Sequence, residues 1–313
     1  MKKKLIATMM TVCLAAIALT GCGGKNSLKM ATGGTTGTYY SYGGVVAQYL
    51  TENAEGVEVN VHSSGASKAN IFEIEDGEAD IAIVQNDVAY YAYNGTDLFA
   101  EDGAVTGFSV LGAAYAEVCQ IVATPDIQSV TDLKGKVVSV GDAGSGCEFN
   151  AHQIFEAYGM TFDDITVQNL SFGDSAEALK DGKIDAFFCV AGAPTTAVVE
   201  LATTNEINVL TIEPSAIDYL KQNYPFYSEY VIPAGTYNGV DTDTTAVAVK
   251  ATFIVSNKLS EDVVYNITKS IYEGKDGIVH EKATELSAAY AVDGIAIPFH
   301  AGAEKYFKEV GVL

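Results

Sequence analysis

The chain has 313 residues, 40 of them acidic and 18 basic, which gives a formal net charge of −22 at pH 7. A surface this acidic repels phosphate backbones and excludes nucleic acid as a partner. The sequence contains no arginine, so a bidentate guanidinium fork is not available for an anionic ligand. Such a ligand must be held by lysine, hydroxyl groups, tyrosine or backbone N–H groups.

The first element is an export signal. Lys2, Lys3 and Lys4 precede an uncharged apolar run over residues 5–19, which is the layout of a secretory signal and is too short to span a bilayer. Leu19-Thr20-Gly21-Cys22 resembles the bacterial lipobox. We therefore expect a lipoprotein signal peptide over residues 1–21 and lipidation of Cys22. Residues 22–27 would form the lipidated start and tether. The alternative is an ordinary signal peptide, with Cys22 incidental.

The rest of the chain alternates short apolar runs with helical patterns, which predicts an α/β protein of about two domains. Removing residues 1–21 takes away three lysines and no acids, so the net charge moves from −22 to −25. The predicted strands are residues 57–61, 81–84, 118–124, 137–140, 186–190 and 247–255. The predicted helices are residues 43–50, 68–74 overlapping with 71–78, 147–158, 176–181 and 263–273.

Three of these helices follow a turn rich in glycine or serine, at residues 33–40, 63–67 and 141–146. Glycine lets the backbone approach a ligand, and the first turn of a helix offers unpaired N–H donors at its positive end. Any one such turn is ordinary in an α/β protein. Three of them in an exported chain predict a binding site for a small polar ligand. None of the three has the P-loop, dinucleotide-binding or GxSxG pattern.

The cysteines and histidines do not predict a metal site. Cys119, Cys147 and Cys189 remain after Cys13 leaves with the signal and Cys22 is lipidated, and none belongs to a CxxC motif. An odd number leaves at least one free thiol, and the three are expected to be small buried apolar residues. We expect no metal and no other cofactor.

The chain as a whole resembles the TAXI-type solute-binding proteins of TRAP transporters. The resemblance covers essentially the whole mature chain in order. It rests on Met30-Ala31-Thr32-Gly33-Gly34, Gly37-Thr38-Tyr39-Tyr40, Ser64-Gly65-Ala66-Ser67 with Asn70, Gly77-Glu78-Ala79-Asp80-Ile81-Ala82 with Val84-Gln85, Leu133-Lys134-Gly135-Lys136-Val137, Gly144-Ser145-Gly146 with Glu148 and Asn150, Gly182-Lys183-Ile184-Asp185-Ala186, Tyr224-Pro225-Phe226, Ile232-Pro233-Ala234-Gly235-Thr236-Tyr237 and Ile297-Pro298-Phe299-His300-Ala301-Gly302.

The resemblance implies a bilobed fold like that of the periplasmic binding proteins (type II), with two strand crossovers near residues 118–124 and 247–255. Lobe one would hold residues 28–120 and 250–313, and lobe two residues 121–249. Ligand would lie between the lobes, which close around it by a hinge motion. The chain departs from the family pattern at Ala66, where a glycine is common, and at Cys147, where a threonine is frequent.

The implied function is capture of a small carboxylate, either a glutamate- or glutamine-like amino acid or a dicarboxylate, and its delivery to the fused membrane subunits of a TRAP transporter. No catalysis is expected. The alternatives are a lipid-anchored receptor for a sensor kinase and an exported enzyme on a related bilobed fold. In either main case the protein would lie outside the cytoplasmic membrane, on the periplasmic or cell-surface side.

Eleven residues in and near the three turns are candidate ligand contacts. The first turn offers hydroxyl groups, the second offers serines, a lysine and an amide, and the third offers an N–H cluster and a carboxylate for an ammonium group. They are Thr36, Thr38, Tyr39, Ser64, Ser67, Lys68, Asn70, Gln85, Ser145, Gly146 and Glu148. Most have a structural alternative: turn stabilisation for Thr36, Thr38 and Tyr39, helix capping for Ser64 and Ser67, solvation for Lys68, loop support for Asn70 and a helix-end interaction for Glu148.

Overall fold

The structure is a computed structural model that describes residues 26–313, so the predicted signal peptide and Cys22 lie outside the described residues. Its strands are β1 (Asn26–Ala31), β2 (Val57–His62), β3 (Ile81–Gln85), β4 (Phe108–Ala123), β5 (Val137–Ser139), β6 (Thr166–Gln168), β7 (Ala186–Ala191), β8 (Asn208–Val209), β9 (Ser228–Ile232) and β10 (Thr244–Ser256). Its α-helices are α1 (Thr38–Asn53), α2 (Ser67–Asp76), α3 (Asn86–Asn94), α4 (Gly146–Ala157), α5 (Phe172–Lys180), α6 (Thr196–Ala202), α7 (Pro214–Asn223), α8 (Glu261–Glu273), α9 (Ala288–Val292) and α10 (Ala301–Glu309).

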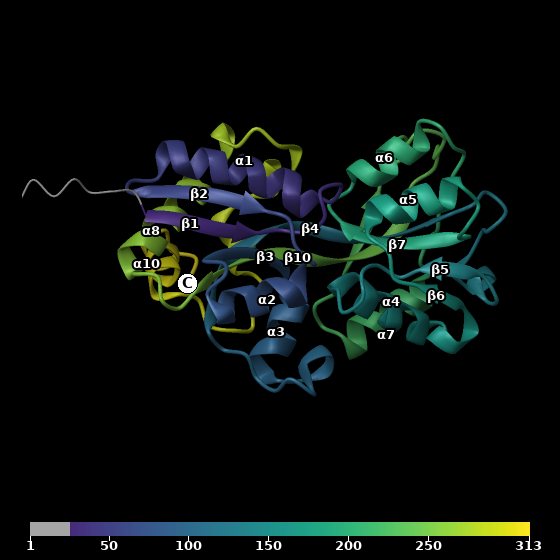
Figure 1. Ribbon diagram of the computed structural model, residues 1–313, viewed down its shortest axis with the longest axis horizontal. Helices are drawn as coiled ribbons and strands as arrows, with labels where there is room; N and C mark the ends of the chain where they lie inside the picture. Colours follow the sequence, from purple (N-terminus) through teal and green to yellow (C-terminus); the bar gives the residue numbers. More distant parts are fainter. Residues whose placement is uncertain (1–25) are drawn as a thin grey trace, which may run out of the picture.

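Two long strands join the two lobes that Figure 1 shows side by side. The sheet order is β2-β1-β3-β10-β4-β7-β5-β6, with β8 on β4 and β9 on β10. β10 pairs with β9 through residues 244–248 and with β3 through residues 251–255. β4 changes partner at Val118, which pairs with both Ala248 of β10 and Ala191 of β7. The predicted α/β fold with two strand crossovers is confirmed.

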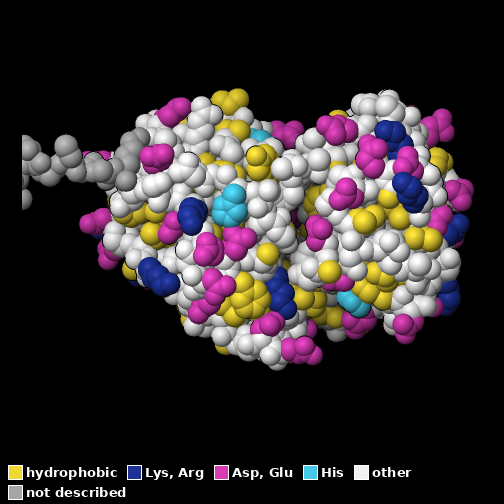
Figure 2. Space-filling view, viewed as in Figure 1, with side chains coloured by type: hydrophobic (Ala, Val, Ile, Leu, Met, Phe, Trp, Pro, Cys, Tyr) yellow, Lys and Arg dark blue, Asp and Glu magenta, His cyan; other side chains and the backbone are white. Residues whose placement is uncertain are grey.

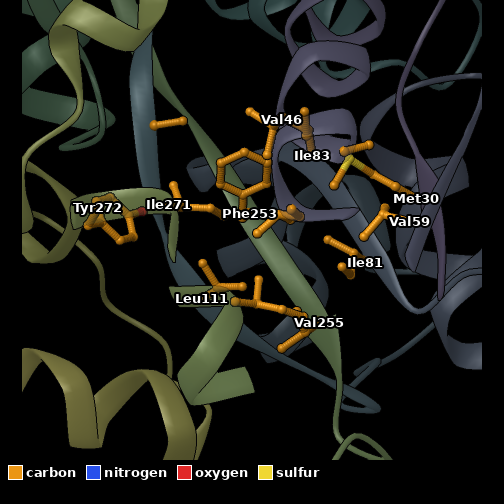
Figure 3. Close-up of a cluster of buried hydrophobic side chains, with 14 of the residues drawn as sticks. Met30, Val46, Val59, Ile81, Ile83, Leu111, Phe253, Val255, Ile271 and Tyr272 are labelled. Carbon is orange, nitrogen blue, oxygen red and sulfur yellow. The ribbon is translucent and has the colours of Figure 1, made fainter. Parts of the chain in front are cut away.

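Helices cover both faces of the sheet in lobe one. The side chains of α1, α8 and α10 pack on one face, together with apolar residues of β1, β3, β4 and β10. Figure 3 shows part of this cluster, with Phe253 of β10 between Val46 of α1 and Ile271 of α8. Helices α2 and α3 cover the opposite face. Because both faces are covered, β3 is buried along its whole length, as parallel strands of α/β proteins are.

Lobe two repeats this layered arrangement. The side chains of α4 and α7 pack on one face of its sheet, and those of α5 and α6 on the other. The three cysteines are free and buried in these two cores. The prediction that they are small buried apolar residues is therefore confirmed. Among residues 26–313, no helix is long and apolar enough to cross a bilayer.

Several predicted boundaries differ from the structure. Helix α1 begins at Thr38 rather than residue 43, and it carries Gly43 and Gly44 inside it. Gly43 is there because a Cβ would lie 2.8 Å from Cγ2 of Thr32 in β1, so the helix packs too closely on the sheet for a side chain. The two crossover strands are also longer than predicted. They extend to Phe108 and to Thr244.

Candidate functional site

A small cavity lies where the two lobes meet. Its volume is about 50 Å³, and Figure 2 shows the hollow between the lobes. Lobe one contributes Gly33, Gly34, Thr36, Gly37, Thr38, Tyr39, Ala66, Ser67, Gln85 and Glu117, and the other lining residues are Asp142, Ser145, Gly146, Cys147, Ser171, Phe172, Val190 and Ala191.

Five helices begin at this cavity. Thr38, Ser67, Gly146 and Phe172 are the first residues of α1, α2, α4 and α5, and Gln85 is the N-cap residue of α3. All five residues line the cavity. Each helix has at least nine residues, so each places the positive end of its dipole at the site. Together these ends favour a negatively charged group in the cavity.

The two lobes differ in how these helix ends are capped. In lobe two, the Ser145 side chain accepts from the backbone N–H of Glu148, and that of Ser171 accepts from Asp174. In lobe one, α1, α2 and α3 begin without a side-chain cap. The first-turn N–H groups of α1 and α2 are therefore the donors that the fold leaves for a ligand.

Glu117, which the sequence reasoning did not select, lies at the cavity on β4. Its side chain is buried, with the residue 2 % exposed, and the hydroxyl of Tyr39 donates a 2.6 Å hydrogen bond to its Oε2. No other hydrogen bond reaches this carboxyl from the described residues. Burial raises the pKa of Glu117 well above its usual range, and the bond from Tyr39 offsets part of that rise. The signal for Glu117 in the sequence is an acidic residue within the largely apolar stretch that forms β4.

The charged residues of the lining are acids. Asp142, in the loop before α4, lines the cavity together with Glu117. Burial and the nearby charge of Asp174 raise the pKa of Asp142. No lysine or histidine lines this cavity among residues 26–313. The cavity therefore combines helix N-termini, which favour an anion, with carboxyl groups, which accept hydrogen bonds.

The structure brings most of the predicted contacts together. Those that line the cavity are Thr36, Thr38, Tyr39, Ser67, Gln85, Ser145 and Gly146. Ser67 does not cap α2 as expected; its Oγ accepts a 3.1 Å hydrogen bond from the backbone N–H of Gln85. The Ser145 hydroxyl caps α4, and no histidine lines the cavity to activate it.

The other four predicted contacts lie outside the cavity lining. Lys68 forms a 2.7 Å ion pair with Asp102 and donates to the carbonyl of Leu98. Glu148 accepts from the N–H of Gly144 at 2.6 Å and from Asn169 at 2.9 Å, so its carboxylate stabilises the loop in front of α4. The Glu148 contacts match its structural alternative at the helix end, whereas Lys68 is held by Asp102 and Leu98 rather than solvated.

Ser64 and Asn70 form a brace beneath the second turn. The hydroxyl of Ser64 donates to Oδ1 of Asn70 at 2.5 Å. The amide of Asn70 donates to the carbonyls of Thr32 and Ile83, at 2.7 and 2.8 Å. Asn70 therefore ties the turn to β1 and β3, and Ser64 lines a separate polar groove beside the cavity.

Direct contacts between the lobes hold them closed around the cavity. The hydroxyl of Thr38 donates to the carbonyl of Gly192 at 3.1 Å, and the N–H of Ala197 donates to the carbonyl of Thr36 at 3.3 Å. These contacts join α1 and its preceding turn to lobe two. The lobes are thus in contact along the α1 side of the cavity.

A buried polar network closes the α3 side. Asn150 of α4 accepts from the side chain of Gln85 and donates to Asp87 at 3.0 Å and to the hydroxyl of Tyr227 at 2.7 Å. Tyr227 in turn donates to Gln153 at 2.6 Å. Burial raises the pKa of Asp87 to about 6, against the lowering effect of its hydrogen bond from Asn150.

Comparison with solved structures identifies the same overall fold in periplasmic binding proteins. A protein from Bordetella bronchiseptica RB50 aligns with a TM-score of 0.55 at 15% identity, covering 91% of this chain and 80% of that one. The periplasmic aliphatic sulphonate binding protein SsuA from Escherichia coli aligns with a TM-score of 0.51 at 15% identity, covering 91% and 83%. The ligand binding component of an ABC-type import system from Staphylococcus aureus, with zinc bound, gives 0.52 at 11%, covering 91% and 90%.

At these identities the structural matches establish the fold. They confirm the predicted bilobed α/β architecture of a periplasmic binding protein. A family model matches residues 30–311, which is nearly the whole described chain. With its two-lobed fold and a cavity ringed by helix N-termini, this chain belongs to the NMT1-like family.

Proposed function

We propose that this protein is an extracytoplasmic receptor that captures a small carboxylate carrying an ammonium group, a glutamate- or glutamine-like amino acid, and delivers it to a membrane transporter. The observation that carries the proposal is the pairing, in one interlobe cavity, of helix N-termini with the buried carboxyl of Glu117. A ligand with charges of both signs matches this pairing. A dicarboxylate without an amino group matches only the helix ends.

Each part of the ligand has an assigned partner in this proposal. The carboxylate takes the unpaired N–H groups at the starts of α1 and α2, with the hydroxyls of Thr36, Thr38 and Ser67 beside it. The ammonium group donates to Glu117. Glu117 thus takes the role that the sequence analysis gave to Glu148. Gln85, Ser145 and Gly146 complete the lining, from α3 and from lobe two.

The transporter that we propose as partner is of the TRAP type, with fused membrane subunits. The support is the run of TAXI-like motifs along the mature chain. Anchoring through a lipid on Cys22 keeps the receptor near that partner without a membrane helix. For the moving parts we propose residues 28–120 with 250–313 as lobe one and residues 121–249 as lobe two. These boundaries lie close to the places where β4 and β10 change partners.

Native mass spectrometry of the purified mature domain tests the ligand. We expect one small molecule per chain, released unchanged on denaturation and identified as an amino acid with a side-chain carboxylate or amide. A chain that is empty and shows no thermal shift with L-glutamate, L-glutamine, L-aspartate or succinate contradicts the carboxylate assignment. A chemically altered ligand contradicts a purely binding role.

Fractionation and uptake test the location and the partner. The Cys22→Ser variant should leave the membrane fraction while keeping ligand affinity, because the cavity does not involve the anchor. Transport by vesicles that contain a TRAP permease should require the receptor. Uptake that instead requires ATP hydrolysis contradicts the TRAP assignment.

A further inference from the structure

Ala66 holds a backbone conformation that alanine rarely adopts. It is the N-cap residue of α2, with φ 64° and ψ −149°. A positive φ with an extended ψ is a region occupied almost only by glycine, because a Cβ meets its own backbone there. Among the described residues, the only other non-glycine residue with positive φ is Asp97, at 47°.

The surroundings of Ala66 fix this conformation. The N–H of Ala66 donates to the hydroxyl of Ser64 at 3.2 Å, and its carbonyl accepts the first helical hydrogen bond, from Asn70, at 2.9 Å. Asn70 is itself anchored to β1 and β3. A strained residue persists where its neighbours over-determine the backbone in this way.

The methyl group contributes nothing to that bracing. Ala66 makes no side-chain cap, and a glycine would make the same backbone hydrogen bonds without strain. The residue is also only partly buried, at the edge of the lobe-one core. Neither hydrogen bonding nor deep burial therefore accounts for an alanine at this position.

The methyl group does have a place at the cavity. Ala66 lines it, and a Cβ placed on the neighbouring lining residue Gly33 would lie 3.7 Å from the Cβ of Ala66 and 3.5 Å from the ring of Tyr39. The methyl thus faces the same corner as Gly33 and Tyr39, at the N-terminus of α2. A methyl group at this position therefore narrows the cavity where α2 begins.

We propose that the Ala66 methyl group is a specificity-determining element that limits the length of the ligand, and that the strained backbone is the cost of keeping it in the cavity. This inference rests on the proposed function, because it names the feature of that site which selects among homologous ligands. One methylene in a close-fitting pocket changes binding by roughly tenfold or more.

The test compares the wild-type protein with Ala66→Gly by titration calorimetry, using L-aspartate, L-glutamate and L-2-aminoadipate as a series that grows by one methylene. We expect two changes in the variant. Its melting temperature without ligand rises by a few degrees, because strain is relieved. Its preference shifts to the next longer homologue, with the ratio of the two Kd values changing about tenfold.

Ala69→Gly is the matched control, since it lies in the same helix, outside the cavity lining, in ordinary helical conformation. It should lower the melting temperature and leave the Kd ratio unchanged. An Ala66→Gly variant that is not stabilised, or that keeps the wild-type Kd ratio, overturns the inference. If neither protein binds any member of the series, the proposed amino-acid ligand fails. The small molecules that copurify with the wild-type protein and with Ala66→Gly then test the inference. If both proteins retain the same molecules, the inference is overturned.

Discussion

Gln85 at the end of β3 donates a hydrogen bond to Asn150 in α4, and this bond joins the two lobes across the cavity. Gln85 lines the cavity, and Asn150 also binds Asp87 and Tyr227. Gln85 therefore takes part both in the lining of the cavity and in the contact between the lobes. A ligand that touches Gln85 acts directly on the contact that holds the lobes together.

Gly146 lies directly against Gln85 in this closed arrangement. A Cβ on Gly146 would lie 1.4 Å from Oε1 of Gln85, which belongs to the opposite lobe. We expect Gly146→Ala to fold, because alanine suits the first turn of a helix, but to hold the lobes apart and weaken ligand binding by at least about tenfold, since ligand binds the closed form. Small-angle scattering with and without ligand measures closure.

The matched control is Gly44→Ala, in helix α1, where nothing lies within 4 Å of the added Cβ. It should raise the melting temperature slightly and leave closure intact. The double variant Gln85→Ala with Gly146→Ala should close again. If Gly146→Ala alone closes normally on ligand, the clash does not control closure.

Asn150→Ala should weaken both closure and stability. The change leaves Asp87 and Tyr227 without their partner in a buried site, at a cost of roughly 1–3 kcal/mol. Urea unfolding and ligand titration measure the two effects. Asn53→Ala, which removes an exposed bond to the carbonyl of Tyr49, should change neither by more than about 0.5 kcal/mol. Equal effects of the two substitutions would argue against a buried interlobe network.

The pH dependence of stability should show the burial of Asp87. Its folded-state pKa is raised from 3.8 to about 6, so the folded protein favours the protonated acid. The unfolded chain loses that proton first as pH rises, and the folded protein therefore loses stability between about pH 4 and pH 6, by roughly 3 kcal/mol. Above about pH 6 this cost is constant.

Asp87→Asn should remove this loss, so that the variant gains on the wild-type protein as pH rises. Unfolding free energies from urea titrations at pH 4.5 and pH 7.5 measure the difference. Asp218→Asn, on the exposed side of α7, serves as the surface control. A wild-type protein and an Asp87→Asn variant with parallel pH profiles would show that Asp87 does not titrate in this range.

Glu117→Gln tests the partner assigned to the ammonium group. A buried carboxylate–ammonium contact loses roughly 2–5 kcal/mol when one charge is removed, so we expect the Kd for an amino acid to rise by at least about 30-fold. A dicarboxylate without an amino group should lose far less, because glutamine imitates the protonated acid.

The same contact gives wild-type binding a pH dependence. The raised pKa of free Glu117 means that binding an ammonium group must displace a proton, so affinity should increase as pH rises towards that pKa and then level off. Calorimetry in buffers of different ionisation enthalpy measures proton release. Proton uptake, or no proton exchange, would assign Glu117 a different role.

The predicted contacts that line the cavity come mostly from the glycine- and serine-rich turns. Thr38, Ser67 and Ser145 lie in glycine- or serine-rich turns, and helix starts carry their own local signals. The sequence predicted the site less well where it depends on distant contacts. Lys68 has the chemistry of an anion partner, but its ammonium group forms an ion pair with Asp102, far along the chain. Glu117 lies in the middle of a crossover strand, and only the meeting of β4 with α1 places its carboxyl at the cavity.

Helix α3 was not predicted, although its buried residues Val88, Ala89, Tyr91 and Ala92 follow a helical spacing. Helix α3 begins directly after β3 without a turn, and Asp87 in its first turn accepts a hydrogen bond from Asn150 of the other lobe. The sequence pattern there records the interface between lobes, which local periodicity does not describe.

The continuous course of β4 and β10 through both lobes has a mechanical consequence. β4 and β10 are the central strands of the sheet in both lobes, so neither lobe has a complete sheet without them. The chain should therefore unfold in one cooperative transition, and the segment 121–249 expressed alone would lack Val118, Cys119 and Gln120, which pair with β7 in the whole chain. Because these strands stay paired, the lobes should open and close by a small twist of β4 and β10. The amide hydrogens of the two strands should remain among the slowest in the molecule to exchange.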